Sequence, residues 1–340
     1  MTVSPASDRL GPTRFAVADI GGTHARFARA HRTSLGAIEL SDPVVLRTSD
    51  HETLPDAWHA FLDAEPGFEP EGAALALAGP VGSGRFKLTN AQWSFDTRTV
   101  HDEIGLPRAV LLNDFEAIAY AIAGDPAADH LEYVAGPRQD LPSDRRITVI
   151  GPGTGLGVAH FRCTDGHASI QPTEGAHIDF PPASDLDDRA LSLLRDLHGR
   201  VSVERVVSGE GIRWIYAAIA DTRDPPDALA VWQAGLGGEN ETEQEVASGL
   251  ARDAIRHFVK TLGRVAGDYA LSHGSAGVVI AGGLGLRLRD LLSDPVFQAG
   301  FSDKGRYRDM MQSIPVKLIT HPQPGLLGAA HAFVARTASS

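Results

Sequence analysis

The most constraining feature of this sequence is a glycine turn that follows a short apolar run, and it occurs twice. Residues 15–20 are apolar and rich in β-forming side chains, and they lead through Gly21 and Gly22 into an alternating run at 25–30. Residues 147–150 form a second such run, followed by a glycine-rich stretch and another alternating segment. Both patterns predict a β-hairpin with glycines at its turn. Two related units, each opening with a glycine hairpin, are the simplest account.

Strands and helices alternate along the rest of the chain. Apolar runs predict buried strands at 73–78, 109–112 and 278–280, and apolar residues recurring every three or four positions predict helices. The predicted helices are 115–123, 188–197, 212–219, 245–271, 286–292 and 326–334. This alternation is typical of the α/β class. Residues 221–245 are polar and rich in turn residues, which predicts a surface excursion.

Length and charge limit the possible functions. The chain has 340 residues with 31 Lys and Arg against 43 Asp and Glu, a net charge of −12, and its length suits about two domains. Such an acidic chain would repel a nucleic-acid backbone or an anionic membrane surface. A single cysteine, Cys163, excludes a disulfide framework. Because neither a signal peptide nor an apolar run of membrane-spanning length is present, we expect a cytoplasmic protein.

Both glycine turns are candidate phosphate sites, because phosphate binding requires several backbone N–H groups at one turn. A Walker loop is excluded at Gly21, Gly22 and Thr23, since a strand-like run follows and there is no lysine. In residues 151–157, Leu156 occupies the place where a dinucleotide fingerprint needs its third glycine. Each turn therefore binds phosphate or is a plain tight turn. Their position at the start of two related units favours a nucleotide.

Several polar residues each allow two interpretations. Asp19 precedes the first turn, where a carboxylate either holds Mg²⁺ beside a nucleotide or braces the turn. Asn113 and Asp114 lie between a predicted strand and a predicted helix, where they are either helix caps or ligand-binding groups at a strand end. In the second role, a carboxylate can accept a proton from an attacking hydroxyl.

The remaining candidates give weaker signals. Glu174, His177 and Glu204 are isolated polar residues, and their spacing in the sequence gives no reason to bring them together. Gly282 and Gly283 follow a predicted strand, which fits an adenosine contact and a plain turn equally well.

Taken in order, these segments resemble the bacterial glucokinase family, within the hexokinase and actin-like ATPase superfamily. The matching stretches are 18–23 (Ala-Asp-Ile-Gly-Gly-Thr), 88–90 followed by Trp93, 113–115, 151–157, 174–180, 204–209, 280–283 and 324–328. Each match is short, but the ordered set spans nearly the whole chain and is specific.

The resemblance implies ATP-dependent phosphorylation of glucose at its 6-hydroxyl, with Asp114 as the catalytic base. It places the following residues around the sugar: Asn90, Asn113, Asp114, Glu174, His177 and Glu204. It places the following residues against ATP: Ala18, Asp19, Ile20, Gly21, Gly22, Thr23, Gly153, Thr154, Gly155, Gly282 and Gly283. Asp19 would also hold Mg²⁺, directly or through water. A homodimer is likewise implied.

The implied fold is the two-domain actin-like ATPase (ribonuclease H-like) α/β fold with an interdomain cleft. In that fold the C-terminal helix returns to the first domain, so we expect a small domain of residues 1–115 plus 325–340 and a large domain of 116–324. Two residues depart from the family pattern. Ala18 precedes Asp19 where glycine is common, and His24 follows the first turn where asparagine is common; the role of His24 stays open.

Three other functions are compatible with parts of this sequence. A kinase of another hexose would carry the same motifs, because the stereochemistry of one hydroxyl depends on side-chain positions rather than types. A sugar-responsive repressor would need an N-terminal DNA-binding helix pair, for which few residues precede the first predicted strand. An actin- or chaperone-like ATPase would give no reason for the sugar-site residues. We therefore expect a glucose kinase.

Overall fold

Two compact units make up the chain in its computed structural model. The described residues are 13–82, 84–88, 91–124, 130–144, 146–164, 167–237 and 242–338. Unit 1 contains Met1–Pro126, Asp165–Pro172 and His321–Ser340, and unit 2 contains Ala127–Thr164 and Thr173–Thr320. No helix within the described ranges is both long and apolar enough to cross a membrane.

A six-stranded sheet forms the centre of unit 1, with the strand order β3-β2-β1-β5-β8 and with β4 paired to β2. Its strands are β1 (Arg14–Ile20), β2 (His24–Arg32), β3 (Ile38–Leu40), β4 (Val44–Arg47), β5 (Ala73–Leu77) and β8 (Ala109–Asn113), and a separate pair is β6 (Arg85–Lys87) and β7 (Ser94–Asp96). The α-helices are α1 (Leu54–Ala64), α2 (Val100–Glu103), α3 (Asp114–Gly124) and α13 (Pro324–Thr337). β1 pairs antiparallel with β2 and parallel with β5, which confirms the first predicted hairpin.

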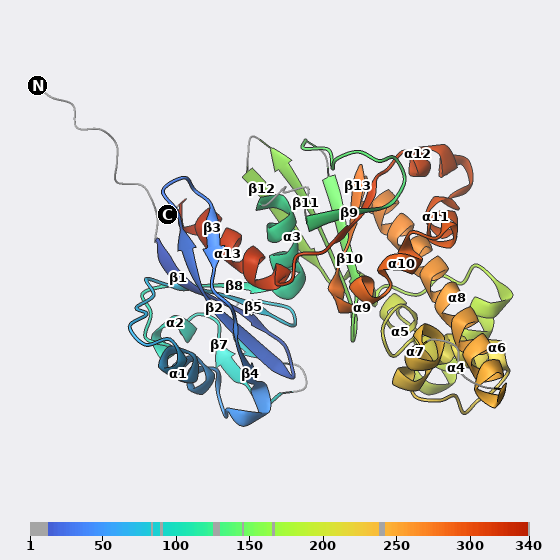
Figure 1. Ribbon diagram of the computed structural model, residues 1–340, viewed down its shortest axis with the longest axis horizontal. Helices are drawn as coiled ribbons and strands as arrows, with labels where there is room; N and C mark the ends of the chain where they lie inside the picture. Colours follow the sequence, from blue (N-terminus) through green and yellow to red (C-terminus); the bar gives the residue numbers. More distant parts are fainter. Residues whose placement is uncertain are drawn as a thin grey trace, which may run out of the picture. The chain divides into compact units, whose positions relative to one another are not determined.

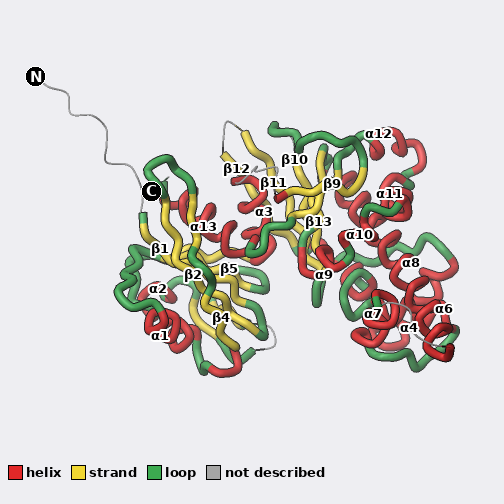
Figure 2. The backbone as a smooth tube through the Cα atoms, viewed as in Figure 1, coloured by secondary structure: helices red, strands yellow, loops and turns green. Residues whose placement is uncertain are grey.

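Both faces of this sheet are buried, because successive residues of β1 point into different hydrophobic clusters. Ile20 shares one cluster with Trp58 of α1, whereas Phe15 and Val17 share another with Phe333 of α13. The rings of Phe15 and Phe333 stack with their centroids 4.4 Å apart. Figure 1 shows the result: α13, in red, lies against the blue N-terminal strands. In the tube view, α1 and α13 lie on opposite sides of the yellow strands (Figure 2).

The boundary of unit 1 differs from the predicted boundary after residue 115. Helix α3 contributes Ala117 and Tyr120 to the cluster that contains Phe333, so it belongs to unit 1 together with α13. A Phe→Ala change at such a buried site costs about 3–5 kcal/mol, which makes α13 an integral part of the unit. The sequence prediction placed the boundary at the polar motif 113–115, although the helix after that motif folds with unit 1.

A second six-stranded sheet has the order β12-β11-β10-β13-β14-β9. Its strands are β9 (Leu131–Ala135), β10 (Arg146–Pro152), β11 (Leu156–Thr164), β12 (His167–Thr173), β13 (Gly277–Ile280) and β14 (Val316–Ile319). The α-helices of unit 2 are α4 (Asp185–His198), α5 (Val203–Val206), α6 (Ile212–Ala220), α7 (Ala228–Leu236), α8 (Thr242–His273), α9 (Gly282–Arg287), α10 (Arg289–Leu292), α11 (Pro295–Ser302) and α12 (Arg308–Gln312). β10 pairs antiparallel with β11 and parallel with β13, which confirms the second predicted hairpin.

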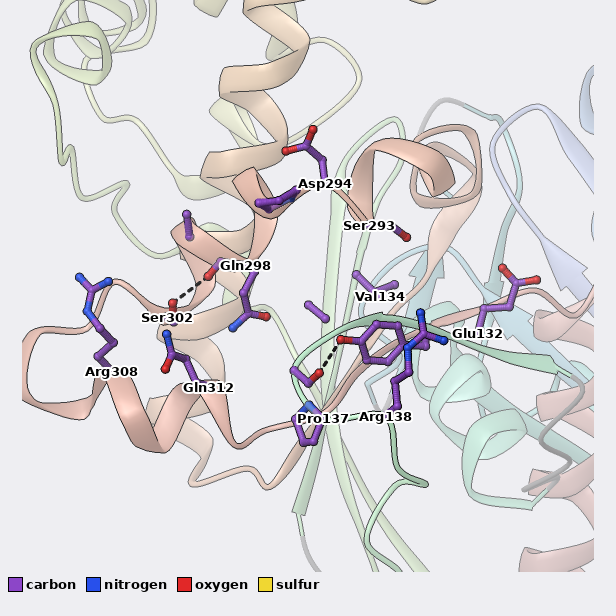
Figure 3. A pocket seen from close by; sticks show the side chains of 15 residues that line it. Glu132, Val134, Pro137, Arg138, Ser293, Asp294, Gln298, Ser302, Arg308 and Gln312 are labelled. Atoms are coloured by element: carbon purple, nitrogen blue, oxygen red, sulfur yellow. Dashed lines mark hydrogen bonds between the residues drawn. The ribbon is translucent and has the colours of Figure 1, made fainter.

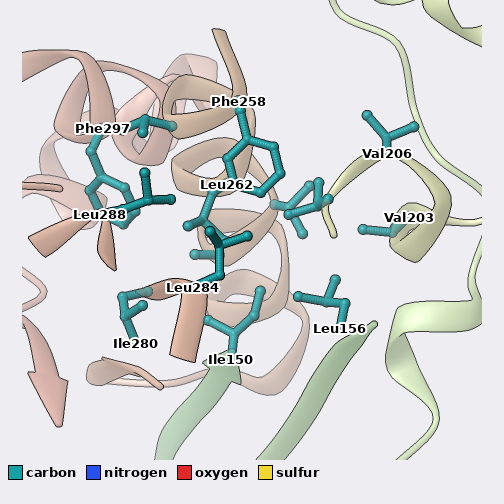
Figure 4. Packing of buried hydrophobic residues seen from close by; sticks show 14 of the residues in the cluster. Ile150, Leu156, Val203, Val206, Phe258, Leu262, Ile280, Leu284, Leu288 and Phe297 are labelled. Atoms are coloured by element: carbon teal, nitrogen blue, oxygen red, sulfur yellow. The ribbon is translucent and has the colours of Figure 1, made fainter. Parts of the chain in front are cut away.

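The core of unit 2 is one hydrophobic cluster that joins the sheet to the long helix α8. Figure 4 shows Ile150 and Ile280 of the sheet beside Leu262 and Phe258 of α8. Phe258 and Leu262 are fully buried. Helix α8 therefore supports the sheet over much of its length.

Two predicted elements of unit 2 differ from the structure. Residues 221–245 are not simply a surface excursion, because they contain α7, whose Val231 and Trp232 are buried in the core. The polar residues around α7 concealed this short apolar stripe. The helix predicted at 286–292 is two short helices, α9 and α10, which meet at Leu288.

Candidate active site

The first glycine turn closes the β1–β2 hairpin of unit 1. The Gly21 N–H donates to the His24 carbonyl at 2.9 Å, and the Thr48 hydroxyl donates to the Gly22 carbonyl at 2.6 Å. Within the described part of the chain, no acceptor lies within hydrogen-bond distance of the Gly22 and Thr23 N–H groups. Thr23 is also exposed. The turn thus presents donors that an anion can use.

Asp19 lies at the carboxyl end of β1, opposite Arg26 of β2. Burial raises the pKa of the Asp19 carboxyl group above its ordinary value, and the charge of Arg26 only partly offsets this effect. Gly325 of α13 approaches so closely that a Cβ there would lie 2.8 Å from Asp19 Oδ2. Among the described residues, no donor is hydrogen-bonded to the carboxylate. A desolvated carboxylate of this kind is typical of a functional site, and its oxygens are the ligands that Mg²⁺ prefers.

Asn113 ends β8 and caps helix α3. Its Oδ1 accepts from the Phe115 N–H at 2.9 Å and from the Glu116 N–H at 3.3 Å, and its own N–H donates to Glu116 Oε2. Its Nδ2 donates to the carbonyl of Gly79, after β5, at 3.0 Å. The capping interpretation is therefore confirmed for Asn113, and one side-chain N–H remains for a ligand.

Asp114 is the first residue of α3, at the carboxyl end of β8. Its Oδ1 accepts from the Phe115 N–H at 2.9 Å, and the side chain is half-buried. The carboxyl ends of parallel strands are where α/β folds bind ligands. The position suits a group that contacts substrate.

The second glycine turn closes the β10–β11 hairpin of unit 2. The Gly153 N–H donates to the Gly155 carbonyl at 2.8 Å, and the Gly153 carbonyl accepts from the Gly209 N–H at 2.7 Å. Thr154 is exposed at the tip, as Thr23 is in the first turn. Both hairpins therefore carry an exposed threonine at a glycine turn, although the first turn is closed by residues 20 and 25 and the second, one residue shorter, by residues 152 and 156.

The third glycine segment lies beside this second hairpin. Gly282 has φ +83°, and a Cβ there would lie 2.7 Å from the Pro152 carbonyl oxygen, so only glycine fits. At Gly153 and Gly283, by contrast, a Cβ would meet no described atom within 4 Å. Backbone groups of both segments thus border open space.

Glu174, His177 and Glu204 are far apart in sequence but lie together in unit 2. His177 Nε2 is 3.8 Å from Glu174 Oε2, and His177 Nδ1 is 4.0 Å from Glu204 Oε1. Both distances exceed the length of a hydrogen bond. The Glu174 and His177 side chains are 57% and 56% exposed. Their polar atoms are therefore accessible to a ligand with several hydroxyl groups.

The fold positions Glu204 through its neighbours. Val203 and Val206 on either side are buried in the core of unit 2, near Leu156 (Figure 4). Glu204 Oε2 accepts a hydrogen bond from the Leu156 N–H at 3.0 Å. The second glycine hairpin and the carboxylate of Glu204 are thus connected directly.

Two cavities of unit 2 differ in their relation to these residues. A cavity of about 190 Å³ is lined by Thr154 and Glu204, together with His198 and Trp214. A cavity of about 990 Å³ between β9 and α11 contains none of the predicted site residues in its lining (Figure 3). The smaller cavity is therefore the one associated with the candidate site.

Asn90 lies outside the described residues. Among those that are described, no group of three or more His, Cys, Asp or Glu could hold a metal ion, so Asp19 is a single carboxylate candidate. No pattern in the sequence indicates that Gly325 contacts Asp19, because the two residues are near opposite ends of the chain.

Two α/β units, each with an antiparallel glycine hairpin that continues into parallel strands, are typical of the actin-like ATPase fold. A glucokinase from an Antarctic psychrotroph has a similar crystal structure, with a TM-score of 0.80 and 31% identity over 94% of this chain and 98% of that one. A ROK family glucokinase from Streptomyces griseus, solved in complex with glucose and AMPPNP, has a TM-score of 0.58 at 19% identity over 93% of this chain and 98% of that one.

Sequence comparison gives the family. The family model described as Glucokinase matches residues 16–336. A glucokinase from Zymomonas mobilis is 43% identical over 319 residues, which cover 93% of this chain and 96% of that protein. The chain belongs to the glucokinase family.

Proposed function

We propose that this protein transfers the γ-phosphoryl group of ATP to the 6-hydroxyl of glucose. Membership of the glucokinase family supports this activity. The structural observation that carries the proposal is the grouping of Glu174, His177 and Glu204, in which the His177 ring nitrogens lie 3.8 and 4.0 Å from the two carboxylates. Carboxylates accept hydrogen bonds from hydroxyl groups, so this group suits a neutral sugar.

Asp114 acts as the general base in this proposal. Its carboxylate takes the proton of the glucose 6-hydroxyl as that oxygen attacks the γ-phosphorus, and the bond from the γ-phosphorus to the bridging oxygen breaks, so that ADP leaves. The side-chain amide of Asn113 is hydrogen-bonded to the first turn of α3 and to the loop after β5. Its remaining side-chain N–H donates to a sugar hydroxyl. We assign Asn113 and Asp114 of unit 1 to glucose binding, as we do Glu174, His177 and Glu204 of unit 2. Asn90 joins them on the family resemblance.

The glycine segments bind ATP. The two glycine turns supply N–H and hydroxyl donors to the phosphates. The first turn comprises Ala18, Asp19, Ile20, Gly21, Gly22 and Thr23, and the second comprises Gly153, Thr154 and Gly155. Gly282 and Gly283 contact the adenosine, and the open space at Gly283 supports this role.

Asp19 is the residue that would hold Mg²⁺ with the nucleotide. When bound, Mg²⁺ supplies positive charge to the transferred phosphoryl group. The acceptor-only carboxylate of Asp19, without a donor among the described residues, fits this role.

A coupled assay of ATP turnover across several hexoses tests the activity. We expect glucose to give the highest kcat/KM and glucose 6-phosphate to be the product. A higher kcat/KM for another hexose would reassign the substrate while retaining the kinase.

Assembly and location are further parts of the proposal. The family resemblance supports a homodimer, which light scattering after gel filtration would measure directly. The single cysteine, Cys163, supports a reducing compartment such as the cytoplasm.

A further inference from the structure

The short turn that carries Glu174 and His177 needs support from the rest of unit 2. It is a single 3₁₀ turn, Gly175–His177, after the end of β12. Such a turn has few internal hydrogen bonds. Its position must therefore be fixed by contacts with other elements.

Two contacts converge on Gly175. The Gly175 N–H donates to Thr173 Oγ1 at 3.1 Å, and the Thr173 hydroxyl donates to the Val158 carbonyl at 2.9 Å. From the other side, the Tyr269 hydroxyl donates to the Gly175 carbonyl at 2.7 Å. The peptide groups of Gly175 are thus held from both the sheet and helix α8.

Tyr269 is buried, with 4% of its surface exposed. A Cβ at Gly175 would lie 3.3 Å from Tyr269 Cε1, so the ring packs directly against this turn. Burial, followed by the charge of Asp268, raises the pKa of the Tyr269 hydroxyl. The hydroxyl therefore keeps its proton and remains a hydrogen-bond donor at neutral pH.

The ring of Tyr269 is in turn packed against His273. The His273 ring stacks on it, with centroids 5.9 Å apart and planes at 25°. His273 Nδ1 lies 2.9 Å from Thr148 Oγ1 of β10, and the centroids of the His273 and His160 rings are 4.4 Å apart. Contacts through His273 thus connect the second sheet to Tyr269, which bonds to the turn.

Helix α8 also holds the segment that follows the turn. Arg264 donates to the Pro181 carbonyl, and its guanidinium lies 5.0 Å from the centre of the Phe180 ring. His257 Nε2 lies 2.8 Å from Asp187 Oδ1. Three side chains of one helix thus contact residues 175–187, and of these three Tyr269 is the one that bonds to the turn itself. From outside the helix, Arg200 donates to the His177 carbonyl at 2.7 Å.

We propose that Tyr269 is a positioning residue for glucose binding. By holding the Gly175 carbonyl, its hydroxyl keeps Glu174 and His177 in the conformation that binds the sugar. This inference rests on the proposed glucose-binding role of that turn. Loss of the hydroxyl lowers the fraction of molecules in the binding-competent conformation, which weakens the apparent affinity for glucose by that fraction. Once glucose is bound, the turn is ordered again and the chemical step is unaffected.

Tyr269→Phe tests the proposal, because it removes the hydroxyl and keeps the packed ring. Tyr133→Phe is the matched control, since the Tyr133 hydroxyl of β9 also donates to a glycine carbonyl, that of Gly136. We expect Tyr269→Phe to raise the Kd and KM for glucose about tenfold, the change in an equilibrium constant that the free energy of one hydrogen bond produces. Its kcat at saturating glucose and its KM for ATP should stay within about twofold of the wild type. Tyr133→Phe should leave the glucose KM unchanged.

Thermal unfolding of both variants separates positioning from general stability. A similar fall in Tm for the two variants, with a change in glucose KM only for Tyr269→Phe, supports the proposal. An unchanged glucose Kd in Tyr269→Phe overturns it. So does an equal change of glucose KM in the Tyr133→Phe control.

Glu174→Ala, measured in parallel, distinguishes this inference from the proposed function. If Glu174→Ala binds glucose as tightly as the wild type, the proposed role of the turn is wrong, and the positioning role of Tyr269 is wrong with it. If Glu174→Ala binds glucose weakly while Tyr269→Phe binds it normally, only the role of Tyr269 is wrong. In the double variant, the effect of Tyr269→Phe should be smaller than in the wild type, because one of the two positioned side chains is absent.

Discussion

The carboxylate of Glu204 is hydrogen-bonded to the backbone N–H of Leu156 at 3.0 Å through Oε2. Its other oxygen, Oε1, lies 4.0 Å from the His177 ring. One side chain therefore touches both the hairpin assigned to ATP and the group assigned to glucose. Glu174, which contacts only the His177 side of this group, has no such connection.

Glu204→Ala and Glu174→Ala should consequently differ in their effect on ATP. Glu174→Ala should weaken glucose binding by about tenfold or more, the effect of leaving hydroxyl partners unpaired, and leave the KM for ATP unchanged. Glu204→Ala should weaken glucose binding and also raise the KM for ATP, because the Leu156 N–H loses its acceptor and the turn loosens. Calorimetry with glucose and its deoxy analogues, and KM values for ATP, measure both effects.

Two outcomes would contradict this assignment. Normal glucose binding in both variants would remove Glu174 and Glu204 from the sugar site. An unchanged KM for ATP in Glu204→Ala would show that the bond to Leu156 has no influence on the nucleotide.

Asp114→Asn should lower kcat by about 10²–10⁴-fold, the usual contribution of a general base, with a small effect on glucose affinity. The amide keeps the size of the side chain and one oxygen that accepts from the Phe115 N–H, but it accepts no proton. Asp227→Asn is the control, since Asp227 is an acidic residue at the start of α7 that accepts from the Ala230 N–H. Turnover of Asp114→Asn within a few-fold of wild type would exclude the base role.

The sequence predicts the two hairpins well because their signals are local. Glycines at fixed places after an apolar run determine a turn whatever the rest of the chain does. The capping role of Asn113 is equally local, since it depends on residues within one helical turn. The two hairpins contain most of the residues that we propose bind ATP.

The grouping of Glu174, His177 and Glu204 could not be predicted from spacing. It depends on the burial of Val203 and Val206 beside Leu156 in one core, a contact between residues far apart in the chain. Helix α7 escaped prediction for a related reason, since the contacts that bury Trp232 come from residues distant in the chain, including Phe258 of α8 and Gly209. Family resemblance supplied the sugar-site residues, and the structure supplies the reason why three of them meet.

Protein stability should fall on acidification because of His273. Burial, followed by the charges of His160 and Arg146, lowers the pKa of His273 to about 4, and burial also lowers the pKa of His160. The unfolded chain therefore binds a proton that the folded chain does not between pH 6.5 and about 4. Over that interval the free energy of unfolding decreases as pH falls, by at most about 1.4 kcal/mol per pH unit for each such proton.

Urea unfolding of wild type and His273→Gln at several pH values in this interval tests the effect. The variant should show a weaker dependence on pH, whereas the carboxyl groups that titrate below pH 5 are common to both proteins. If the free energy of unfolding depends equally on pH in the two proteins, the pKa of His273 is not lowered by folding.

Asp19 provides the last prediction, in which stability and activity change in opposite directions. Burial raises the pKa of its carboxyl group, so the folded state prefers the protonated form, and stability is lost as pH rises from 3.8 through the folded pKa. At neutral pH the ionised Asp19 is therefore destabilising, and Asp19→Asn should stabilise the fold by roughly 0.5–2 kcal/mol. Asp96→Asn is a matched control in unit 1. Asp96 is partly exposed and paired with Arg98, which lowers its pKa to about 2, so its substitution should not stabilise the protein.

The same Asp19→Asn variant should lose most of its activity and need more Mg²⁺, because it lacks the carboxylate that would hold the metal. Neither glycine hairpin contains a lysine that could neutralise the phosphates in place of Mg²⁺. Urea unfolding at pH 7 gives the stability, and kcat across a Mg²⁺ titration gives the requirement for metal. A side chain that only braces the β1–β2 turn would give the reverse result, with lower stability and normal turnover at every Mg²⁺ concentration. A gain in stability together with a loss of activity is expected only if the carboxylate is kept at this desolvated position for the reaction.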